Sequence, residues 1–272
     1  MNIKSTEKNQ TEFNPFDLLT FEERTEKGWL LPYLIQIDVM FSKRWLYWGE
    51  TLLGNKILDC QIPQIQFSSP DKKGFDNLRD CLNKYSHTGV YFSDFRDWLL
   101  WGFGEGEERA NINSDVNEYW YRTFNLGLLL QTPWDYLGEI MAENKQGYWN
   151  NPNAFFPTPH HVCEMMFQMS MTDLKKTGED EKCKTVNDPC VGTGRMLLHA
   201  SNYSLCLSGN DIDINCVKSC KINGFLYVPW LVKPAAWMVK SKQVESKKIN
   251  IEKSDFKKFD VQKKPMEQLE WC

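Results

Sequence analysis

The feature that most constrains the fold is a glycine-containing turn set between a candidate strand and a candidate helix. Residues 186–195 read Val-Asn-Asp-Pro-Cys-Val-Gly-Thr-Gly-Arg. Because glycine has no Cβ, Gly192 and Gly194 allow such a turn to pass close to a ligand. A second candidate strand, Leu205–Gly209, is followed by Asp211, nineteen residues after Gly192. In a doubly wound fold an acid at this place binds ribose hydroxyls, so the pattern predicts a nucleotide-type ligand.

The C-terminal half alternates between candidate strands and helices. A helix is predicted over His161–Met171 and another over Gly194–Ser201, with a third starting at Ile214 and ending near residue 226. Strands are predicted at Cys183–Asn187, Leu205–Gly209 and Ile249–Lys253. This alternation predicts the α/β class, with a parallel, Rossmann-like sheet.

The N-terminal half has the spacing of helices. Helices are predicted over Phe21–Gly28, Trp29–Trp48, Phe75–Lys84, Tyr91–Phe103, Asp115–Gln131 and Trp134–Asn144, with a loop from Gly54 to Gly74. The tryptophans and phenylalanines of this half are interpreted as helical core. A run of Gly, Asn and Pro over 145–159 marks the strongest break. The sequence therefore predicts a mainly helical domain, 1–150, and a Rossmann-like domain, 151–272.

Composition excludes several classes. No apolar run approaches the roughly 18 residues of a spanning helix, and no leader signature is present at the start, so a cytoplasmic protein without a membrane is expected. Nine cysteines without C-x-x-C spacing and four histidines argue against a zinc site or a disulfide framework, and no metal is expected. Residues 1–150 are net acidic and 151–272 only slightly basic. If the protein binds nucleic acid, a partner would therefore have to supply much of the binding.

The turn also differs from a dinucleotide fingerprint. Position 197, where a third glycine would stand, is Leu, which argues against NAD or FAD. A Gly-x-Gly pair on its own is as consistent with an ordinary turn as with a ligand loop. The order of strand, acid, glycine turn, helix, strand and acid carries the ligand interpretation.

The segment Asp-Pro-Cys-Val-Gly-Thr-Gly at 188–194 resembles the first motif of S-adenosylmethionine-dependent DNA methyltransferases that act on amino nitrogens. The modification (M) subunit of type I restriction systems is the most similar. Asp-Tyr-Leu-Gly-Glu-Ile at 135–140 and Phe-Phe-Pro-Thr-Pro at 155–159 also resemble those subunits, as do Asp-Ile-Asp at 211–213 with the later Asn223, and Ser-Asp-Phe at 254–256. The resemblance covers roughly residues 134–260. It implies an S-adenosylmethionine domain and DNA as substrate.

The resemblance also implies how the cofactor is held at its methionine end. Phe156 and Thr158 would flank that end, and Asp188 would lie near its amino group. Gly192 and Gly194 would provide the close approach of the backbone.

At the adenosine end, the resemblance assigns a further four residues. Asp211 would bind the ribose hydroxyls, with Ile212 against the adenine face. Asp255 would hold the adenine amino group, with Phe256 beside it.

One expected motif is missing, so no catalytic residue is assigned. Enzymes that methylate amino groups of bases carry Asn/Asp-Pro-Pro-Tyr/Phe, whose polar groups hold the target amine and whose aromatic ring stacks on the flipped base. The nearest sequences, Asn-Pro-Phe at 14–16 and Asn-Pro-Asn at 151–153, lack the second Pro and precede the cofactor motifs. Three explanations stay open: a truncated or split chain, a second catalytic or specificity subunit or homo-oligomer that supplies the rest, or a non-catalytic cofactor-binding or assembly module.

Two other groups have competing interpretations. Pro189 and Cys190, which belong to the cofactor turn, form the dipeptide that carries the nucleophile in cytosine-C5 enzymes. Their place before Gly-x-Gly favours a small packing role for the cysteine. His160 and His161 are adjacent, and adjacent side chains on a helix point apart, which disfavours a metal pair. A capping or solvent-exposed role is expected for them.

Overall fold

The computed structural model describes residues 20, 23–86, 89–144, 155–177 and 181–238. Their contacts form two compact units. The first contains the described residues of Met1–Pro32 and Asp76–Asn125, and the second those of Tyr33–Phe75 and Leu126–Cys272. Residues 33–75 and 126–144 thus belong with the C-terminal half. The domain boundary predicted near residue 150 lies outside the described residues and stays a prediction. None of the described helices is long and apolar enough to cross a membrane.

The first unit is helical and has an aromatic core. Its elements are a 3-10 helix, Glu23–Thr25, α4 (Phe92–Gly102) and α5 (Ser114–Thr123), and the division between the units falls within α1 (Leu31–Asp38) and α3 (Lys72–Asn83). The rings of Trp98 and Trp120 meet edge to face at 5.7 Å. The Trp120 indole N–H donates to the Cys81 carbonyl at 2.7 Å, which satisfies the polar end of a buried ring. The interpretation of the aromatics as helical core is confirmed for Trp98 and Trp120, whereas Phe41 is exposed.

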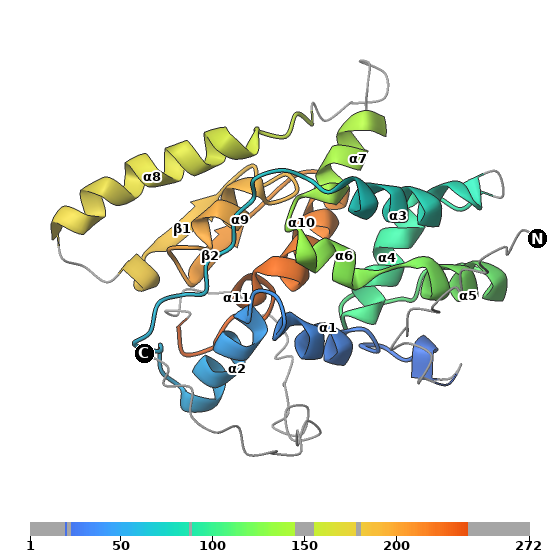
Figure 1. Cartoon of the computed structure of the whole chain (residues 1–272), viewed down its shortest axis with the longest axis horizontal. Coiled ribbons are helices and arrows are strands. Elements are labelled where there is room, and N and C mark those ends of the chain that lie inside the picture. The colour runs from blue at the N-terminus through green and yellow to red at the C-terminus, as the bar shows by residue number, and fades with distance from the viewer. Residues whose placement is uncertain (1–19, 21–22, 87–88, 145–154, 178–180, 239–272) are drawn as a thin grey trace, which may run out of the picture. The chain divides into compact units, whose positions relative to one another are not determined.

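The second unit contains a parallel pair of strands among helices. In chain order its elements are α2 (Arg44–Gly54), α6 (Leu126–Gln131), α7 (Tyr136–Asn144), α8 (His160–Thr177), a 3-10 helix (Glu181–Cys183), β1 (Thr185–Asp188), α9 (Arg195–Ala200), β2 (Cys206–Gly209), α10 (Ile214–Tyr227) and α11 (Pro229–Val232). Figure 1 shows the two arrows side by side with α9 between them in the chain. The strand pair and its connecting helix agree with the predicted order. The larger Rossmann-like sheet stays a prediction, and the candidate strand Ile249–Lys253 lies outside the described residues.

The parallel register brings the two strand ends to one edge. Thr185 pairs with Cys206, and Asp188 pairs with Gly209. Both strands therefore end at the same level, and the turn after β1 lies beside the segment after β2. A Cβ on Gly209 would lie 2.7 Å from Val191 Cγ2, so this close packing depends on glycine.

The single helix predicted over Trp29–Trp48 is wrong, because α1 ends at Asp38 and α2 begins at Arg44. The Asp38 carboxylate accepts hydrogen bonds from the Trp45 backbone N–H at 2.8 Å and from the Ser42 hydroxyl. Lys43 has a positive φ of 60°, which no continuous helix permits. A side chain that bonds to the backbone in this way ends one helix and orders the start of the next.

Three further helices also differ from prediction. The helix expected over Asp115–Gln131 is divided, because Phe124 is extended and the Asn77 side chain bonds to the backbone on both sides of it. Of the helix expected over Phe21–Gly28, the described part contains only the 3-10 turn Glu23–Thr25. The helix expected from Trp134 begins at Tyr136.

A buried arginine fixes α2 within the second unit. The Arg44 guanidinium donates to the Pro63 carbonyl at 2.8 Å, to the Ser201 hydroxyl at 2.6 Å and to the Tyr227 carbonyl at 2.9 Å, and it also bonds to Asn202. Burial lowers its pKa to about 9. These bonds hold the loop that contains Pro63 against the end of α9.

Candidate cofactor site

A cavity of about 440 Å³ lies where the two strands end. We call it the glycine-turn cavity. Eight of the eleven residues predicted for the cofactor line it, namely Phe156, Thr158, Asp188, Pro189, Cys190, Gly192, Asp211 and Ile212. Gly194 does not line it, and Asp255 and Phe256 lie outside the described residues. The segment before α8, the glycine turn after β1 and the end of β2 therefore meet at one place.

The glycine turn is bonded directly to the acid of the second strand. The Gly192 N–H donates to Asp211 Oδ2 at 2.8 Å, and Gly192 has a φ of +53°, in the region that favours glycine. The Val191 N–H donates to the Asn210 carbonyl at 2.9 Å. The turn and the second strand end therefore form one rigid wall of the cavity.

The Asp211 carboxylate is oriented on both sides. Its Oδ1 accepts from the Asp213 N–H at 2.8 Å, while Asp213 caps α10 by accepting from the Asn215 N–H at 2.9 Å. Each carboxylate oxygen keeps a further lone pair that can accept from a ligand hydroxyl. Beside it, Ile212 is 90% exposed, so its apolar side chain packs on little protein and is available to a ligand.

Gly194 serves packing between helices. It has a φ of +94° and precedes α9, and a Cβ at this position would lie 2.8 Å from Cys220 Sγ. The missing side chain thus lets the start of α9 approach α10. The glycine positions the turn from behind the cavity, whereas the prediction placed it next to a ligand.

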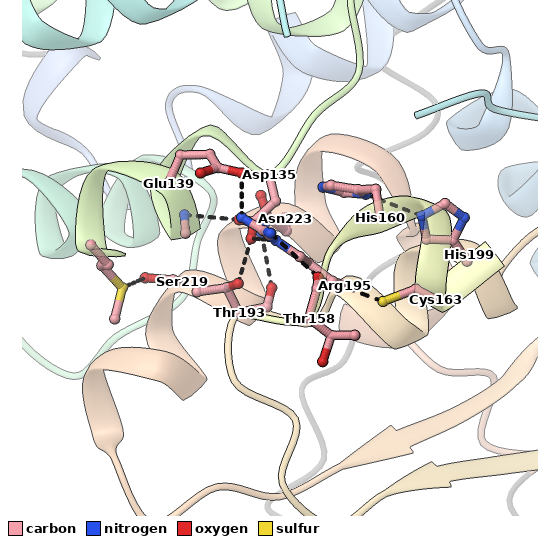
Figure 2. A network of polar contacts seen from close by, with 12 residues as sticks. Asp135, Glu139, Thr158, His160, Cys163, Thr193, Arg195, His199, Ser219 and Asn223 are labelled. Carbon is pink, nitrogen blue, oxygen red and sulfur yellow. Dashed lines mark hydrogen bonds and ion pairs between the residues drawn. The ribbon is translucent and has the colours of Figure 1, made fainter. Parts of the chain in front are cut away.

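A buried carboxylate on the far side of the turn holds the site together. Asp135, directly before α7, is fully buried. Its Oδ2 accepts from the Thr193 hydroxyl at 2.5 Å and from Arg195 Nε at 2.7 Å, and its Oδ1 accepts from the Asn223 amide at 2.7 Å. Figure 2 shows these side chains converging on the carboxylate. The turn, α9, α10 and the start of α7 are therefore fixed by one charged group.

The Asp135 network also requires a glycine at position 138. Its N–H donates to Asp135 Oδ1 at 2.9 Å, as expected for an acid that caps its own helix. A Cβ on Gly138 would lie 1.9 Å from Asp135 Oδ2 and 2.7 Å from Thr193 Oγ1. The Asp-x-x-Gly spacing at 135–138 thus has a physical reason within this chain: the glycine leaves room for the bonds of the acid.

Arg195 extends the network to the segment before α8. Its Nη2 donates to Glu139 Oε1 at 2.7 Å, and its Nη1 donates to the Thr158 carbonyl at 3.3 Å. Thr158 is thereby placed in the cavity wall, next to Phe156, which is 82% exposed. The sequence interpretation did not include Thr193 or Arg195. Their only signal was their place directly beside the two glycines.

The two adjacent histidines separate, as their spacing predicts. His161 is exposed, whereas His160 is buried, so the expected solvent role is wrong for His160. His160 Nδ1 lies 3.1 Å from His199 Nε2. Burial, with smaller contributions from Arg195 and His199, lowers the pKa of His160 to about 3, and burial lowers the pKa of His199 to about 4. Both rings are therefore neutral at pH 7.

Two further candidates from the sequence are Cys190 and a metal site. Cys190 is exposed at the cavity, so it is not the packed residue that was expected. The described residues contain no group of three or more His, Cys, Asp or Glu side chains suited to hold a metal ion.

Comparison of the chain with family models, curated proteins and solved structures finds no match.

Proposed function

We propose that the glycine-turn cavity binds S-adenosylmethionine and that the chain is a DNA adenine-N6 methyltransferase, or a subunit of one. The observation that carries the proposal is the bond from the Gly192 N–H to Asp211 Oδ2. It joins a backbone turn able to approach a ligand to an acid able to hold ribose hydroxyls. The volume of the cavity lies in the range of small-molecule sites.

The residues of the cavity fit the two ends of this cofactor. Asp211 would accept from the ribose hydroxyls, with Ile212 against the adenine ring. Asp188 would accept from the amino group of the methionine end, and Phe156 and Thr158 would cover that end. When bound, S-adenosylmethionine supplies an electrophilic methyl group on a sulfonium, so the contribution of the protein is to bind and orient it.

The buried network behind the cavity would keep these residues in place. Arg195 lines the cavity, and together with the buried Asp135 it ties the turn to α7, α10 and the Thr158 carbonyl. Rigid support of this kind keeps the entropy of ordering the site small when a ligand binds.

A second candidate function is a non-catalytic cofactor-binding or assembly module. It is favoured by the absence of any Asn/Asp-Pro-Pro-aromatic sequence from the 272 residues. Without that motif, the amino group of a target base has no assigned acceptor in this chain.

The decisive experiment measures cofactor binding and methyl transfer on the same preparations. Calorimetry with S-adenosylmethionine would compare the wild type with Asp211→Ala and with Asp59→Ala, which removes an exposed carboxylate that does not line the glycine-turn cavity. Transfer of a labelled methyl group to adenine-containing duplex DNA would be followed in parallel. We expect Asp211→Ala to weaken cofactor binding at least tenfold and Asp59→Ala to leave it unchanged.

The outcomes separate the two candidates. Binding with transfer to adenine supports the methyltransferase. Binding without transfer supports the module. A folded wild-type protein that binds no S-adenosylmethionine, or an Asp211→Ala variant that binds it as well as the wild type, contradicts both.

A further inference from the structure

A larger cavity of about 870 Å³ lies within the same unit, and the proposed function makes no use of it. We call it the histidine cavity, because His160 and His199 form part of its wall. The loop residue Phe67 and the start of α8 complete it. The two cavities share Pro157 and Arg195 as lining residues.

The lining of the histidine cavity is acidic. Glu139 and Glu164 contribute carboxylates, and the one lining guanidinium, Arg195, is already paired with Asp135 and Glu139. The two lining histidines that are buried add no positive charge, because their pKa values are lowered to about 3 and about 4. At pH 7 these groups therefore favour a cation and repel an anion such as phosphate.

The wall is also aromatic and carries a buried ring nitrogen without a partner. Trp134 packs on His160 with ring centroids 3.9 Å apart, and Phe67 stacks on His160 at 5.6 Å. His160 is 4% exposed, and its Nε2, which accepts a hydrogen bond when Nδ1 carries the ring proton, has no partner within the described part of the chain. Buried polar atoms of this kind normally have partners, which a bound ligand can supply.

We infer that the histidine cavity binds an organic cation, an amine or guanidinium attached to an apolar body. Glu164, on the exposed side of α8, supplies a carboxylate for the charged group. The aromatic wall supplies apolar surface and ring faces, with which organic cations interact favourably. Two sources share this chemistry: a free small-molecule amine and a basic side chain of a partner protein. The inference does not depend on the proposed function.

The test uses two probes of the same shape, one charged and one neutral. Benzylamine and benzyl alcohol would be titrated into the full-length protein at low salt, with the indole N–H signal of Trp134 as a local NMR reporter. That signal is identified by its loss in Trp134→Phe. We expect benzylamine to shift it and to bind at least about five times more tightly than benzyl alcohol, with the difference shrinking as salt is added.

A matched pair of variants assigns the charge. Glu164→Gln should weaken benzylamine binding at least threefold and leave benzyl alcohol unchanged. Glu50→Gln removes an exposed carboxylate on α2, outside the cavity, and should leave both unchanged. Both positions are exposed, so the variants should fold, which circular dichroism checks.

Two competitors distinguish the sources. Displacement of benzylamine by tryptamine, a free amine on an apolar body, supports a small-molecule amine, and displacement by a blocked Phe-Arg peptide supports a partner side chain. The inference is overturned if neither competitor displaces benzylamine, if the alcohol binds as well as the amine, or if Glu164→Gln behaves like Glu50→Gln. Because S-adenosylmethionine binding is measured through Asp211, failure here leaves the proposed function untouched, and the reverse also holds.

Discussion

The Asp135 carboxylate joins three segments that are distant in the sequence, and all its partners are donors. Thr193, Arg195, Asn223 and the Gly138 N–H each donate to it. No orientation of a neutral amide could match this set, because its NH2 group would face a donor. The identity of residue 135 is therefore dictated by its partners.

We predict that Asp135→Asn lowers the free energy of unfolding of the second unit by about 3 kcal/mol. Breaking a buried ion pair leaves the guanidinium of Arg195 short of its main partner, and costs of about 3–5 kcal/mol are typical. Urea denaturation measures the change. Glu164→Gln, which removes an exposed carboxylate, should change it by less than about 1 kcal/mol. Equal effects of the two variants would refute the role of the network.

Gly138→Ala tests the same network without removing a charge. A Cβ would overlap Asp135 Oδ2 and press on Thr193 Oγ1. We expect a loss of about 2–3 kcal/mol of stability, as for overpacking of a buried site. Gly54→Ala, at the end of α2 where the nearest atom would be 3.7 Å away, should instead be neutral or slightly stabilising. Thermal and urea unfolding of the two variants, compared with the wild type, would show the contrast.

At the residue scale, the sequence predicted the glycines and the acids at the strand ends, but it did not predict which of them face the cavity and which serve packing. Gly192 and Asp211 were paired by a spacing that the fold converts into a hydrogen bond. Gly194 serves helix packing, which a local pattern does not reveal. Arg195 was missed because its partners lie about sixty residues away, and periodicity carries no information on such contacts.

Between the elements, the contact of α8 with α9 depends on two neutral histidines. His160 begins α8, His199 lies in α9, and their ring nitrogens are 3.1 Å apart. Protonating both rings would place two positive charges in one buried pair, close to Arg195. This helix contact should therefore be sensitive to acid.

We predict that stability falls as the pH drops from 7 to 5. The folded-state pKa values of these histidines, about 3 and about 4, lie below the ordinary 6.5. The unfolded chain thus binds more protons over this range. The stability that the two neutral histidines contribute is complete above about pH 6.5 and is lost progressively as the pH falls below it. Each histidine contributes about 2 kcal/mol between pH 7 and pH 5. Burial raises the pKa of Asp38, which acts in the opposite direction at lower pH.

The comparison of His199→Gln with His161→Gln checks this assignment by urea unfolding at both pH values. His199→Gln should lose about half of the pH-dependent change or more, because the pair is then gone. His161→Gln, which removes an exposed ring, should keep the wild-type behaviour. An unchanged pH dependence in His199→Gln would show that other groups titrate.

The order of strands and helices from residue 185 was predictable, and the helix boundaries in the N-terminal half were not. Strand, helix, strand and helix follow residue 185 as the alternation and the glycine turn predict. The apolar spacing of Trp29–Trp48 is continuous, which predicts one helix. The break comes from the Asp38 carboxylate bonding to Trp45, a side-chain effect that hydrophobic spacing does not reveal.

For the whole molecule, the two compact units give the proposed function a spatial signature. All described residues of the glycine-turn cavity and of the network behind it belong to the second unit. A ligand bound there stabilises the folded form of the unit that contains its site. None of the described residues of the first unit lines the cavity, so that unit should respond differently.

We therefore predict that S-adenosylmethionine slows amide hydrogen exchange in the second unit alone. At a free concentration a hundred times the Kd, binding adds about 2.7 kcal/mol, which corresponds to a slowing of up to about a hundredfold for amides that exchange through opening of that unit. Peptides from α9 and α10 should show the change, and peptides from α4 and α5 should not. Asp211→Ala, which we expect to weaken binding at least tenfold, should reduce this slowing about tenfold or more at the same cofactor concentration. Equal slowing in both units would contradict a binding site confined to this cavity. A site within the second unit slows exchange in the first unit only if the two units are coupled.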